Sequence, residues 1–443
     1  MFIRETMRYF IETYGCQMNK AESAALENQF ADHGWIKATE ADEANLVLIN
    51  TCSVRITAET RAWGRIAHYS ARKRLRPFTL VVTGCMAERL KEKMMEKAPG
   101  IDYVLGTFQK AAFGLVLDAV EAGRHLESVE ETPRFVFAPS HREAGSFSTF
   151  VPIMHGCDNF CSYCIVPYVR GREISRSPVA ISQEIHDLAQ AGVREITLLG
   201  QNVNSYQWTG EGGPLDFAGL LRHVAPQALA AGIGRIRFVS SHPKDLSRAT
   251  IETIAGHPVF ARHIHLCVQH GSDRVLSAMN RKYTRADYLA LVEDIRSSIP
   301  GITISTDILV GFPGETEEDV EETLSLLREV RFAYAFMYHY NPREGTPAAS
   351  MPDRVPELVK KERLARVMAL QKEISSDIMH GMVGNEINVL IESLSKRKAD
   401  EVFARTDADM MVVFPAPSSR IGSFTRVRLE SVTGHTFKAV EVM

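Results

Sequence analysis

Between residues 9 and 122, short apolar runs alternate with longer stretches whose apolar residues recur at helical spacing. Asn19 and Glu22 have the spacing of a capping box, so we expect the first helix to begin with Asn19 as its cap. This alternation predicts an open α/β domain with a parallel sheet over residues 7–123. The predicted strands are 9–14, 46–50, 79–83 and 103–106, and the predicted helices are 19–34, 57–76, 87–97 and 110–122.

Residues 124–146 interrupt this pattern. They are charged, contain Pro133 and Pro139 and show no clear period, which predicts a linker. The alternation then resumes with longer units over residues 147–380, and six successive βα units predict a partial (βα)6 barrel of the TIM type. Its predicted strands are 149–155, 195–199, 235–240, 263–268, 303–310 and 332–339, and a long helix is expected at 355–380.

Residues 381–443 follow a third pattern, with short apolar runs and no convincing helix. Five short strands in so few residues predict a small antiparallel β-barrel. The expected fold class is therefore α/β, with an open parallel domain, a partial barrel and a small C-terminal barrel. The short strands are expected near 387–392, 403–406, 410–414, 425–431 and 436–442.

The composition is that of an ordinary globular protein, since 45% of the 443 residues are hydrophobic and 24% are charged. A formal charge of -3 excludes a uniformly basic nucleic-acid coat, although a local basic face remains possible. The longest apolar runs fall short of the ~20 residues that cross a bilayer, and the N-terminus lacks the apolar core of an export signal. We therefore expect a cytoplasmic protein without a membrane partner.

Seven cysteines, odd in number and unevenly spaced, suit metal ligands better than disulfides in a reducing compartment. Three of them, Cys157, Cys161 and Cys164, lie within eight residues. Three thiolates so close in sequence can hold three irons of a [4Fe–4S] cluster and leave the fourth iron open to a chelating ligand. The spacing differs from those of zinc ribbons and bacterial ferredoxins, although a zinc site in a loop remains an alternative.

The other cysteines are scattered. Cys16, Cys52 and Cys85 each follow the carboxyl end of a predicted parallel strand. Because such ends face the same way in an open sheet, the three thiols could meet and bind a second cluster with an open iron. The alternative is three buried, unreactive cysteines. Cys267 lies within a predicted barrel strand, where we expect a small apolar packing residue.

The cysteine motifs carry a family resemblance. The segment from Gly156 to Arg176 resembles the cluster motif of radical S-adenosylmethionine enzymes. The segments 14–19, 50–55 and 83–87 resemble the three motifs of the methylthiotransferase N-terminal domain, and the C-terminal barrel resembles a TRAM RNA-binding module. The resemblance spans essentially the whole chain in the right order, so the chain is identified as a member of the radical methylthiotransferase family.

This resemblance implies two [4Fe–4S] clusters with separate tasks. The cluster on Cys157, Cys161 and Cys164 would reduce S-adenosylmethionine to a radical that takes hydrogen from C2 of an adenosine. The auxiliary cluster on the three scattered cysteines would present the methylated sulfur. No side chain is expected as a catalytic acid or base. An electron donor such as flavodoxin or ferredoxin is implied, and we expect a monomer.

Within the family, residues 15–19, 166–173 and 199–206 resemble the branch that methylthiolates N6-isopentenyladenosine at position 37 of tRNA, beside the anticodon. Cys267 and His270 depart from the sequence HLPVQSGS that is usual in that branch. Two alternatives stay open: methylthiolation of N6-threonylcarbamoyladenosine at the same position, and an RNA-binding iron–sulfur redox or carrier protein without catalysis.

The resemblance also implies residues around S-adenosylmethionine. These comprise an aromatic residue beside the adenine, a motif after the second barrel strand for the methionine end, residues at the ends of the third and fourth strands, and a turn that packs on the adenine. They are Tyr163, then Gly200, Gln201 and Asn202, then Ser240 and Gln269, and finally Gly311 and Phe312. His242, a lone histidine at the end of the third strand, is expected to be a hydrogen-bonded structural residue.

Clustered cations are candidates for RNA phosphates. They fall on one predicted helix of the first domain, in the radical-cluster loop and in the C-terminal barrel. The usual alternative is a solvated helix face. The candidates are Arg61, Arg65, Arg72, Lys73, Arg74, Arg170, Arg172, Arg405 and Arg426.

Overall fold

The computed structural model describes residues 6–132, 135–138, 146–396, 398 and 400–442. These residues form two compact units. The first contains residues up to 143 together with 154–158 and 164–176, and the second contains the remainder. The described part of the predicted linker 124–146 has no helix or strand, and Pro133 and Pro139 lie outside the described residues.

The first unit contains a five-stranded parallel sheet in the order β2-β1-β3-β4-β5. The four predicted strands are confirmed to within two residues, and the short edge strand β2 is an addition. The strands are β1 (Arg8–Thr13), β2 (Ile36–Lys37), β3 (Leu46–Thr51), β4 (Thr79–Gly84) and β5 (Tyr103–Leu105).

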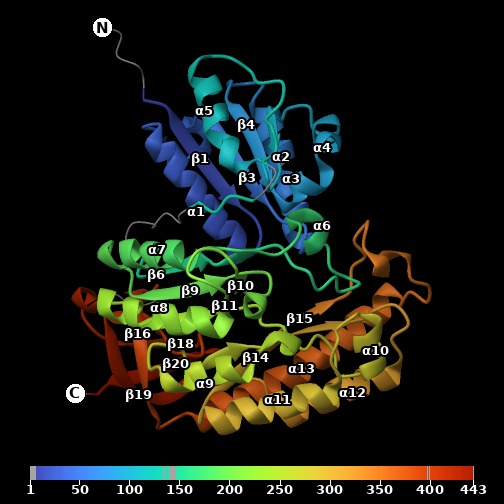
Figure 1. Cartoon of the computed structure of the whole chain (residues 1–443), viewed down its shortest axis with the longest axis vertical. Coiled ribbons are helices and arrows are strands. Elements are labelled where there is room, and N and C mark those ends of the chain that lie inside the picture. The colour runs from blue at the N-terminus through green and yellow to red at the C-terminus, as the bar shows by residue number, and fades with distance from the viewer. Residues whose placement is uncertain (1–5, 133–134, 139–145, 397, 399, 443) are drawn as a thin grey trace. The chain divides into compact units, whose positions relative to one another are not determined.

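Helices cover both faces of this sheet (Figure 1). Every residue of the central strand β3 is buried, because Leu46 and Leu48 face one helical layer and Val47 and Ile49 face the other. One layer consists of α1 (Gln17–Asp32) and α5 (Phe113–Glu121), with a 3-10 turn at Lys110–Ala112. The other consists of α2 (Ile56–Arg72), α3 (Cys85–Leu90) and α4 (Glu92–Lys97).

The prediction that Asn19 caps the first helix is wrong. Cys16 is the N-cap of α1, and Asn19 occupies the third helical position, from which its side chain completes the capping box. Glu22 takes no part in that box and is buried instead. The predicted helix 87–97 is also wrong as a single helix, because the chain breaks at Lys91, where φ is 46°.

The second unit contains the predicted partial barrel. Two parallel sheets, β6-β9-β12 and β13-β14-β15, are joined by a bridge between Ser241 and Leu266 into a row of six strands. Helices lie between successive strands, as predicted (Figure 1). The strands are β6 (Ser148–Pro152), β9 (Glu195–Leu199), β12 (Arg235–Phe238), β13 (His263–His265), β14 (Thr303–Val310) and β15 (Tyr334–His339). The helices are α7 (Pro178–Gln190), α8 (Phe217–Ala231), α9 (Arg248–Gly256), α10 (Asp273–Ala278), α11 (Arg285–Ser298), α12 (Glu317–Val330) and α13 (Glu357–Gly381).

Two small features interrupt this pattern. The predicted strand 149–155 is divided, since β6 ends at Pro152 and β7 (Met154–His155) pairs antiparallel with β8 (Ile174–Ser175) in the first unit. The radical-type cysteine motif lies between β7 and α6 (Val166–Arg170). A hairpin of β10 (Gln207–Trp208) and β11 (Leu215–Asp216) precedes α8.

The C-terminal strands close into a barrel in the order β16-β17-β18-β20-β19. The predicted small antiparallel barrel is confirmed, with one exception, because β18 and β20 run parallel. Val389, Phe414 and Phe437 lie in its core. The strands are β16 (Glu386–Leu394), β17 (Glu401–Arg405), β18 (Met411–Pro415), β19 (Phe424–Thr433) and β20 (Thr436–Glu441).

An ion-pair network ties this closed barrel to the amino ends of β9 and β12. Glu195 accepts hydrogen bonds from Arg235 at 2.9 Å and from Arg237 at 2.9 Å. The same guanidinium groups reach the closed barrel, where Arg235 pairs with Asp407 at 2.6 Å and Arg237 donates to the Thr406 carbonyl at 2.5 Å. The carboxyl ends of the same strands therefore remain available for a ligand. Within the described residues, no helix combines the length and apolarity that a bilayer crossing requires.

Gly84 is fixed by close backbone packing ahead of Cys85. Its φ is +99°, and a Cβ there would lie 2.3 Å from the Thr51 carbonyl oxygen, whereas a Cβ at Gly34 (φ +72°) would meet no atom within 4 Å. We expect Gly84→Ala to cost about 2–5 kcal/mol of unfolding free energy from strain plus overpacking. Gly34→Ala should cost only about 1–2 kcal/mol, because it adds strain alone. Urea denaturation followed by circular dichroism measures both, and equal costs would contradict the packing argument.

Candidate iron–sulfur and cofactor sites

Cys16, Cys52 and Cys85 meet at one edge of the first sheet. They follow β1, β3 and β4, which are neighbouring parallel strands. Cys52 and Cys85 are buried, at 1% and 2% exposure, and Cys16 is half-buried. A Cβ placed on Gly15 would lie 2.9 Å from the Cβ of Cys52, so the loop with Cys16 packs directly against the loop with Cys52. The structure thus brings together the three cysteines that are scattered in sequence.

Two asparagines hold these loops in place. The side-chain nitrogen of Asn19 donates to the Asn50 side-chain oxygen and to the Thr51 carbonyl, both at 3.0 Å. Asn50 in turn donates to the Asn19 carbonyl at 2.9 Å and to Ser23 Oγ at 2.9 Å. Both asparagines are fully buried. Since buried amides need partners, this reciprocal pair fixes the loop after β1 against the end of β3.

The three cysteines share one electrostatic environment, in which Arg170 is the opposing cation. Burial raises the pKa of Cys85 to about 11, the Arg170 guanidinium opposes that shift, and the neighbouring Glu22, Cys52 and Cys16 add to it. Burial, followed by the neighbouring Cys16, likewise raises the pKa of Cys52. These mutual effects place the three thiols in one neighbourhood at the sheet edge. Three convergent sulfur donors beside a fixed cation fit an iron–sulfur cluster, whose net charge is negative.

The cation is held by Glu22. The Glu22 carboxylate pairs with Arg170 at 2.6 Å and with Lys110 at 2.5 Å, and its side chain is 6% exposed. Burial alone would raise the pKa of Glu22, but Arg170 and Lys110 hold it well below its usual range. The prediction of an RNA contact at Arg170 is therefore wrong, because its side chain is only 3% exposed and serves as a counter-ion.

The loop from β7 to α6 carries the other three cysteines. Cys157 and Cys161 are buried and Cys164 is half-buried. In the first unit, the Cys157 backbone N–H donates to the Gly171 carbonyl at 3.2 Å. In the second unit, the Ser162 N–H donates to the Met279 carbonyl, and Ser162 in turn accepts from the Ala348 N–H. Each of these hydrogen bonds fixes its own part of the loop within one unit.

Arg281 approaches one of these thiols. Its guanidinium donates to Cys161 Sγ at 3.4 Å, to the Cys267 carbonyl at 2.7 Å and to the Tyr283 hydroxyl at 3.0 Å. The residue is 4% exposed. A buried cation that donates to a cluster ligand stabilises the thiolate form. The sequence offered no signal for it, because Arg281 lies in an ordinary charged stretch and only the fold brings it to the cysteine.

The strand ends that are predicted to face the barrel mouth show backbone strain. Ser240 and Gln269 follow the neighbouring strands β12 and β13, and both adopt positive φ, at 67° and 69°. Non-glycine residues rarely adopt this conformation, and such strain clusters where ligands bind. This observation supports the prediction that both residues border the cofactor.

Several buried polar atoms at the same strand ends have no hydrogen-bond partner among the described residues. They are Gln201 Oε1, Ser241 Oγ and His242 Nε2. Burial, with Arg281 and Lys244 nearby, lowers the pKa of His242 to about 2, so its ring is neutral. Because His242 Nδ1 accepts from the Lys244 N–H, its proton lies on Nε2, which is a free donor. Such orphaned groups fit a polar ligand.

Asn202 is held within the protein. Its side-chain nitrogen donates to Asp245 at 2.6 Å, and its oxygen accepts from the His242 N–H at 3.2 Å. Asn202 therefore ties the loop after β9 to the loop after β12, which positions Gly200 and Gln201. Both polar atoms of the Asn202 side chain are therefore used to hold these loops together.

Tyr163, Gly311 and Phe312 come together in the second unit. Tyr163 packs on an apolar cluster that contains Phe312 and Tyr340. Phe312 is fully buried and belongs to the cluster against which Tyr163 packs. The turn at Gly311 is clamped by Glu315, whose carboxylate accepts from the Gly311 N–H at 2.8 Å and pairs with His270 at 3.1 Å. His270 thus stabilises the turn that resembles the adenine-binding segment.

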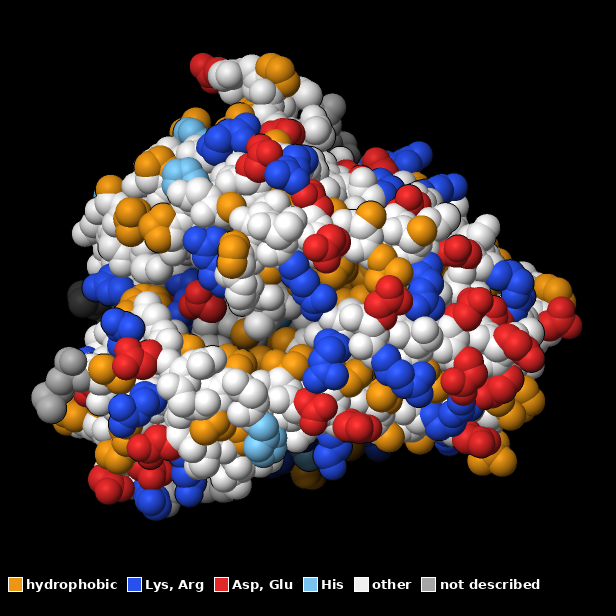
Figure 2. Space-filling view, turned by 90° about the horizontal axis from the view of Figure 1, so that it is seen from below, with side chains coloured by type: hydrophobic (Ala, Val, Ile, Leu, Met, Phe, Trp, Pro, Cys, Tyr) orange, Lys and Arg blue, Asp and Glu red, His pale blue; other side chains and the backbone are white. Residues whose placement is uncertain are grey.

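Most candidate RNA-binding cations already have acidic partners. Arg65 pairs with Glu12, Arg72 with Asp42, Lys73 with Asp102 and Arg172 with Asp158. In the closed barrel, Arg405 pairs with Glu392 and Asp409, and Arg426 pairs with Glu386. Arg61 and Arg74 are exposed. Figure 2 shows a face on which basic and acidic side chains are intermixed, without one continuous basic patch.

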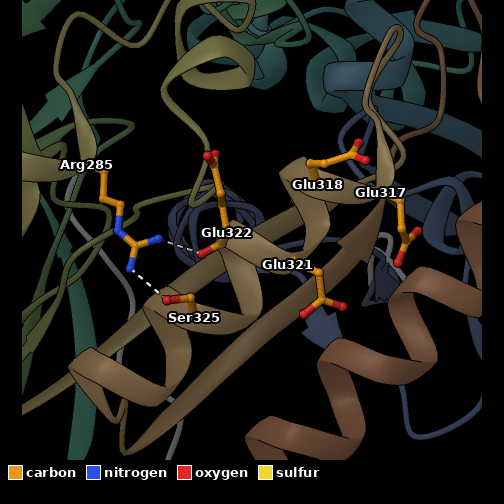
Figure 3. A pocket seen from close by; sticks show the side chains of 6 residues that line it. All are labelled: Arg285, Glu317, Glu318, Glu321, Glu322 and Ser325. Atoms are coloured by element: carbon orange, nitrogen blue, oxygen red, sulfur yellow. Dashed lines mark hydrogen bonds between the residues drawn. The ribbon is translucent and has the colours of Figure 1, made fainter.

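A surface pocket between the start of α11 and α12 is unsuited to the cofactor or to RNA. Figure 3 shows that its lining is mostly carboxylate, with Arg285 turned toward Glu322 and Ser325. Phosphate and carboxylate ligands would be repelled there. The lining residues are Arg285, Glu317, Glu318, Glu321, Glu322 and Ser325.

Three family models match the chain in the order that the sequence predicts. An uncharacterised protein family, UPF0004, matches residues 8–106, the radical SAM superfamily matches residues 151–327, and the TRAM domain matches residues 381–440. Among solved structures, the chain resembles the radical S-adenosylmethionine methyltransferase TsrM from Kitasatospora setae, with a TM-score of 0.57 and 16% identity over 78% of this chain and 77% of that one. That likeness concerns the fold alone.

Curated relatives match over nearly the full length. A tRNA-2-methylthio-N(6)-dimethylallyladenosine synthase from Treponema pallidum (strain Nichols) is 50% identical over 98% of both chains. A protein of the same name from Treponema denticola is 48% identical over 98% of this chain and 99% of its own. One from Moorella thermoacetica is 42% identical over 96% of both.

The Glu22 ion pairs generate a stability prediction. Glu22→Gln should cost about 3–5 kcal/mol, because Arg170 and Lys110 remain buried without their counter-charge. The pKa of Glu22 is lowered from 4.5, so its stabilisation is present above pH 4.5 and is lost as the pH falls below that value. The variant should therefore show a flatter stability profile below pH 4.5.

Urea titrations at several pH values measure this effect. The control is Glu43→Gln, which breaks an exposed pair with Arg8 and should cost no more than about 1 kcal/mol. An equal cost for the two variants would refute the role of Glu22 as a buried counter-ion.

The two sets of cysteines predict how much iron the protein binds. Anaerobically reconstituted protein should hold about eight irons, and replacing Cys16, Cys52 and Cys85 together should leave about four. Cleavage of S-adenosylmethionine to 5′-deoxyadenosine should persist in that triple variant. If cleavage disappeared while four irons remained, the assignment of roles to the two cysteine sets would be wrong.

Proposed function

The chain belongs to the tRNA-2-methylthio-N(6)-dimethylallyladenosine synthase family, and from this membership we propose how its own residues serve the reaction. It is a radical S-adenosylmethionine methylthiotransferase that converts N6-isopentenyladenosine in tRNA to the 2-methylthio form. We place that adenosine at position 37, beside the anticodon. Convergence of Cys16, Cys52 and Cys85 at one sheet edge is the observation that carries this assignment, because it provides a sulfur-bearing site in addition to the radical motif.

Two [4Fe–4S] clusters and S-adenosylmethionine supply, when bound, the radical that removes hydrogen from C2 and the methylated sulfur that replaces it. The protein supplies ligands and position. We infer that Cys157, Cys161 and Cys164 hold the radical cluster, while the three convergent cysteines hold the auxiliary one. An aromatic C–H has no acidic proton for a base to remove, so we assign no side chain as a catalytic acid or base.

We infer that S-adenosylmethionine lies at the carboxyl ends of the barrel strands. Supporting observations are the strained backbones of Ser240 and Gln269 and the unpartnered buried atoms of Gln201 and His242. The partly buried Tyr163 offers a ring for the adenine, and Glu315 fixes the turn at Gly311. Gly200 permits close approach of the backbone to the cofactor. Asn202 and Phe312 hold the surrounding residues in position, Asn202 through its hydrogen bond to Asp245 and Phe312 through its buried ring.

Aromatic residues of β15 are evidence for the isopentenyl group as part of the substrate. Phe336 is 44% exposed and contacts His265 edge to face, and Tyr338 is 38% exposed two residues further along the strand. Exposed rings of this kind suit an apolar five-carbon tail and a flat base. A threonylcarbamoyl group carries a carboxylate that would require a cationic partner. The exposed rings and the name that the curated relatives share favour the isopentenyl branch over the threonylcarbamoyl branch.

We propose that a flavodoxin or ferredoxin delivers the electron, and that the protein acts as a monomer in the cytoplasm, where its tRNA substrate is found. The proposed RNA contacts are the exposed Arg61 and Arg74 and the paired Arg172, Arg405 and Arg426.

The proposed domains are 7–123 for the auxiliary cluster, 124–146 as linker, 147–380 for the radical core and 381–443 for the TRAM module.

A non-catalytic iron–sulfur carrier is the rival from another functional class. A carrier would need neither the strained strand ends nor the unpartnered polar atoms around the barrel mouth. Reduced protein that receives S-adenosylmethionine should therefore release 5′-deoxyadenosine. A fully reconstituted, reduced protein that releases none would favour the carrier.

The substrate assignment is tested with matched tRNA. Burial of about five carbons is worth roughly 3–4 kcal/mol at ~0.8 per methylene, and part of it should appear as correct orientation of C2. We expect methylthiolation of tRNA bearing N6-isopentenyladenosine and poor reaction of unmodified or threonylcarbamoylated tRNA, measured by nucleoside mass spectrometry. Equal reaction of the threonylcarbamoyl form would overturn the branch assignment and leave the family assignment standing.

A further inference from the structure

The interior face of the partial barrel carries an unusual row of polar side chains on β13 and in the segment that follows it. Residues 263, 265 and 267 share one face, because side chains alternate along an extended chain. His263 contacts Thr303 Oγ1 at 2.8 Å and His265 contacts Ser305 Oγ at 2.9 Å, so the facing residues of β14 point the same way. The alternate residues Ile264 and Leu266 are buried in the opposite, apolar layer.

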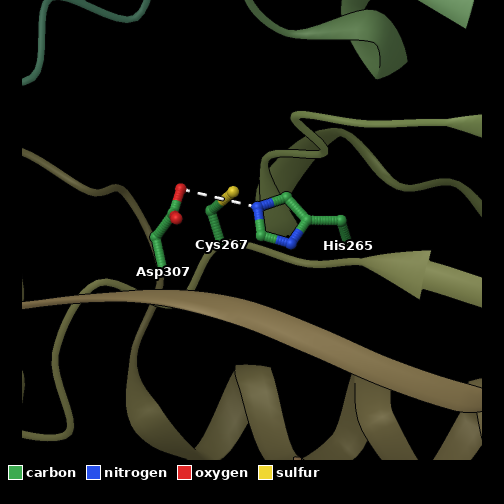
Figure 4. A group of neighbouring side chains, drawn as sticks. All are labelled: His265, Cys267 and Asp307. Atoms are coloured by element: carbon green, nitrogen blue, oxygen red, sulfur yellow. Dashed lines mark ion pairs between the residues drawn. The ribbon is translucent and has the colours of Figure 1, made fainter. Parts of the chain in front are cut away.

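Cys267 belongs to this polar row. It is 9% exposed, and its sulfur lies with a nitrogen of His265 and a carboxylate oxygen of Asp307 so that all three atoms are within 4.8 Å of one another. Figure 4 shows the three groups directed toward one another, with the sulfur beside the line that joins His265 to Asp307. The expectation of an apolar packing residue at Cys267 therefore needs correction, because its neighbours are ionisable.

The distances are close to those of a tetrahedral metal site. His265 Nε2 lies 3.5 Å from Asp307 Oδ2. A tetrahedral zinc ion with bonds of 2.0–2.1 Å would place nitrogen and oxygen ligands about 3.3 Å apart. The sulfur would lie about 3.6 Å from either, and the observed upper limit of 4.8 Å requires only small side-chain rotations.

The surroundings orient these donors. Ser305 Oγ contacts His265 Nδ1 at 2.9 Å, which leaves Nε2 directed to the other two groups. A second hydrogen bond on the remote ring nitrogen is the usual support of a metal-ligating histidine. Arg281 donates to the Cys267 carbonyl at 2.7 Å and fixes the backbone of that residue. The Asp307 side chain is 29% exposed, which provides access for an ion.

We propose that His265, Cys267 and Asp307 form a mononuclear zinc site inside the barrel, in addition to the two iron–sulfur clusters. One imidazole, one thiolate and one carboxylate give the ligand types that zinc prefers, with the fourth tetrahedral position open to water or to a group of a bound ligand. A thiolate and a carboxylate together balance the charge of the dication. A single sulfur donor excludes an additional cubane cluster, which takes several thiolates.

Zinc analysis of the cluster-loaded protein tests the site. The reconstituted holoenzyme, freed of unbound metal, is equilibrated anaerobically with zinc buffered at about 10 nM, a concentration suited to protein zinc sites. We expect about one zinc per chain beside about eight irons in the unaltered protein. Cys267→Ala and Asp307→Asn should lose the zinc and keep the iron.

His263→Gln is the matched control. It lies on the same face of the same strand but contacts Thr303, Ser305 and Tyr334 rather than a thiol. This variant should retain the zinc. If Cys267→Ala is unstable, Cys267→Ser offers a variant of similar volume with a weaker zinc ligand, and its iron content reports whether the fold is intact.

X-ray absorption at the zinc edge separates this site from zinc bound at cluster cysteines. The proposal requires one sulfur at about 2.3 Å and two or three nitrogen or oxygen atoms at about 2.0–2.1 Å. Three sulfur neighbours would place the zinc at a cluster motif and overturn the proposal. Zinc content that does not depend on Cys267, or no zinc in a protein with full iron, would overturn it as well.

Discussion

Parallel strands impose the constraint on which both parts of this protein depend, because their carboxyl ends all meet at one edge. In the first unit this geometry gathers Cys16, Cys52 and Cys85, although 36 and 33 positions separate them in the sequence. In the second unit the same geometry gathers the loops that contain Gly200, Ser240 and Gln269. Hydrophobic burial on both faces of the first sheet makes its edge rigid, so that polar and sulfur groups can be held there without collapse into the core.

Charge burial adds specificity to this framework. Glu22, Arg170 and Lys110 form a buried group beside the convergent cysteines, and Glu195 with Arg235 and Arg237 forms another at the amino ends of the barrel strands. Each group costs desolvation free energy and is tolerated because every charge has a partner. One group fixes a cation near the thiols, and the other attaches the closed C-terminal barrel at the amino ends of the strands, away from their carboxyl ends.

The sequence predicted the parts that depend on local pattern. Strand periodicity located β3, β9 and β14 nearly to the residue, and the position of each cysteine after a strand predicted where the thiols would meet. The failures arise from long-range contacts. Asn19 was expected to cap a helix, but its amide is needed by Asn50 and Thr51, so Cys16 takes the cap. Arg170 was expected to contact RNA, but it forms a buried ion pair with Glu22, which lies 148 positions away in the sequence.

The account is tested most directly by the nucleosides of tRNA from cells that lack this protein. It predicts that 2-methylthio-N6-isopentenyladenosine disappears and that N6-isopentenyladenosine accumulates in its place, with both changes reversed by the unaltered chain and not by a chain in which Cys16, Cys52 and Cys85 are replaced. An unchanged level of the methylthio nucleoside, or loss of the methylthiolated threonylcarbamoyl form alone, would contradict it.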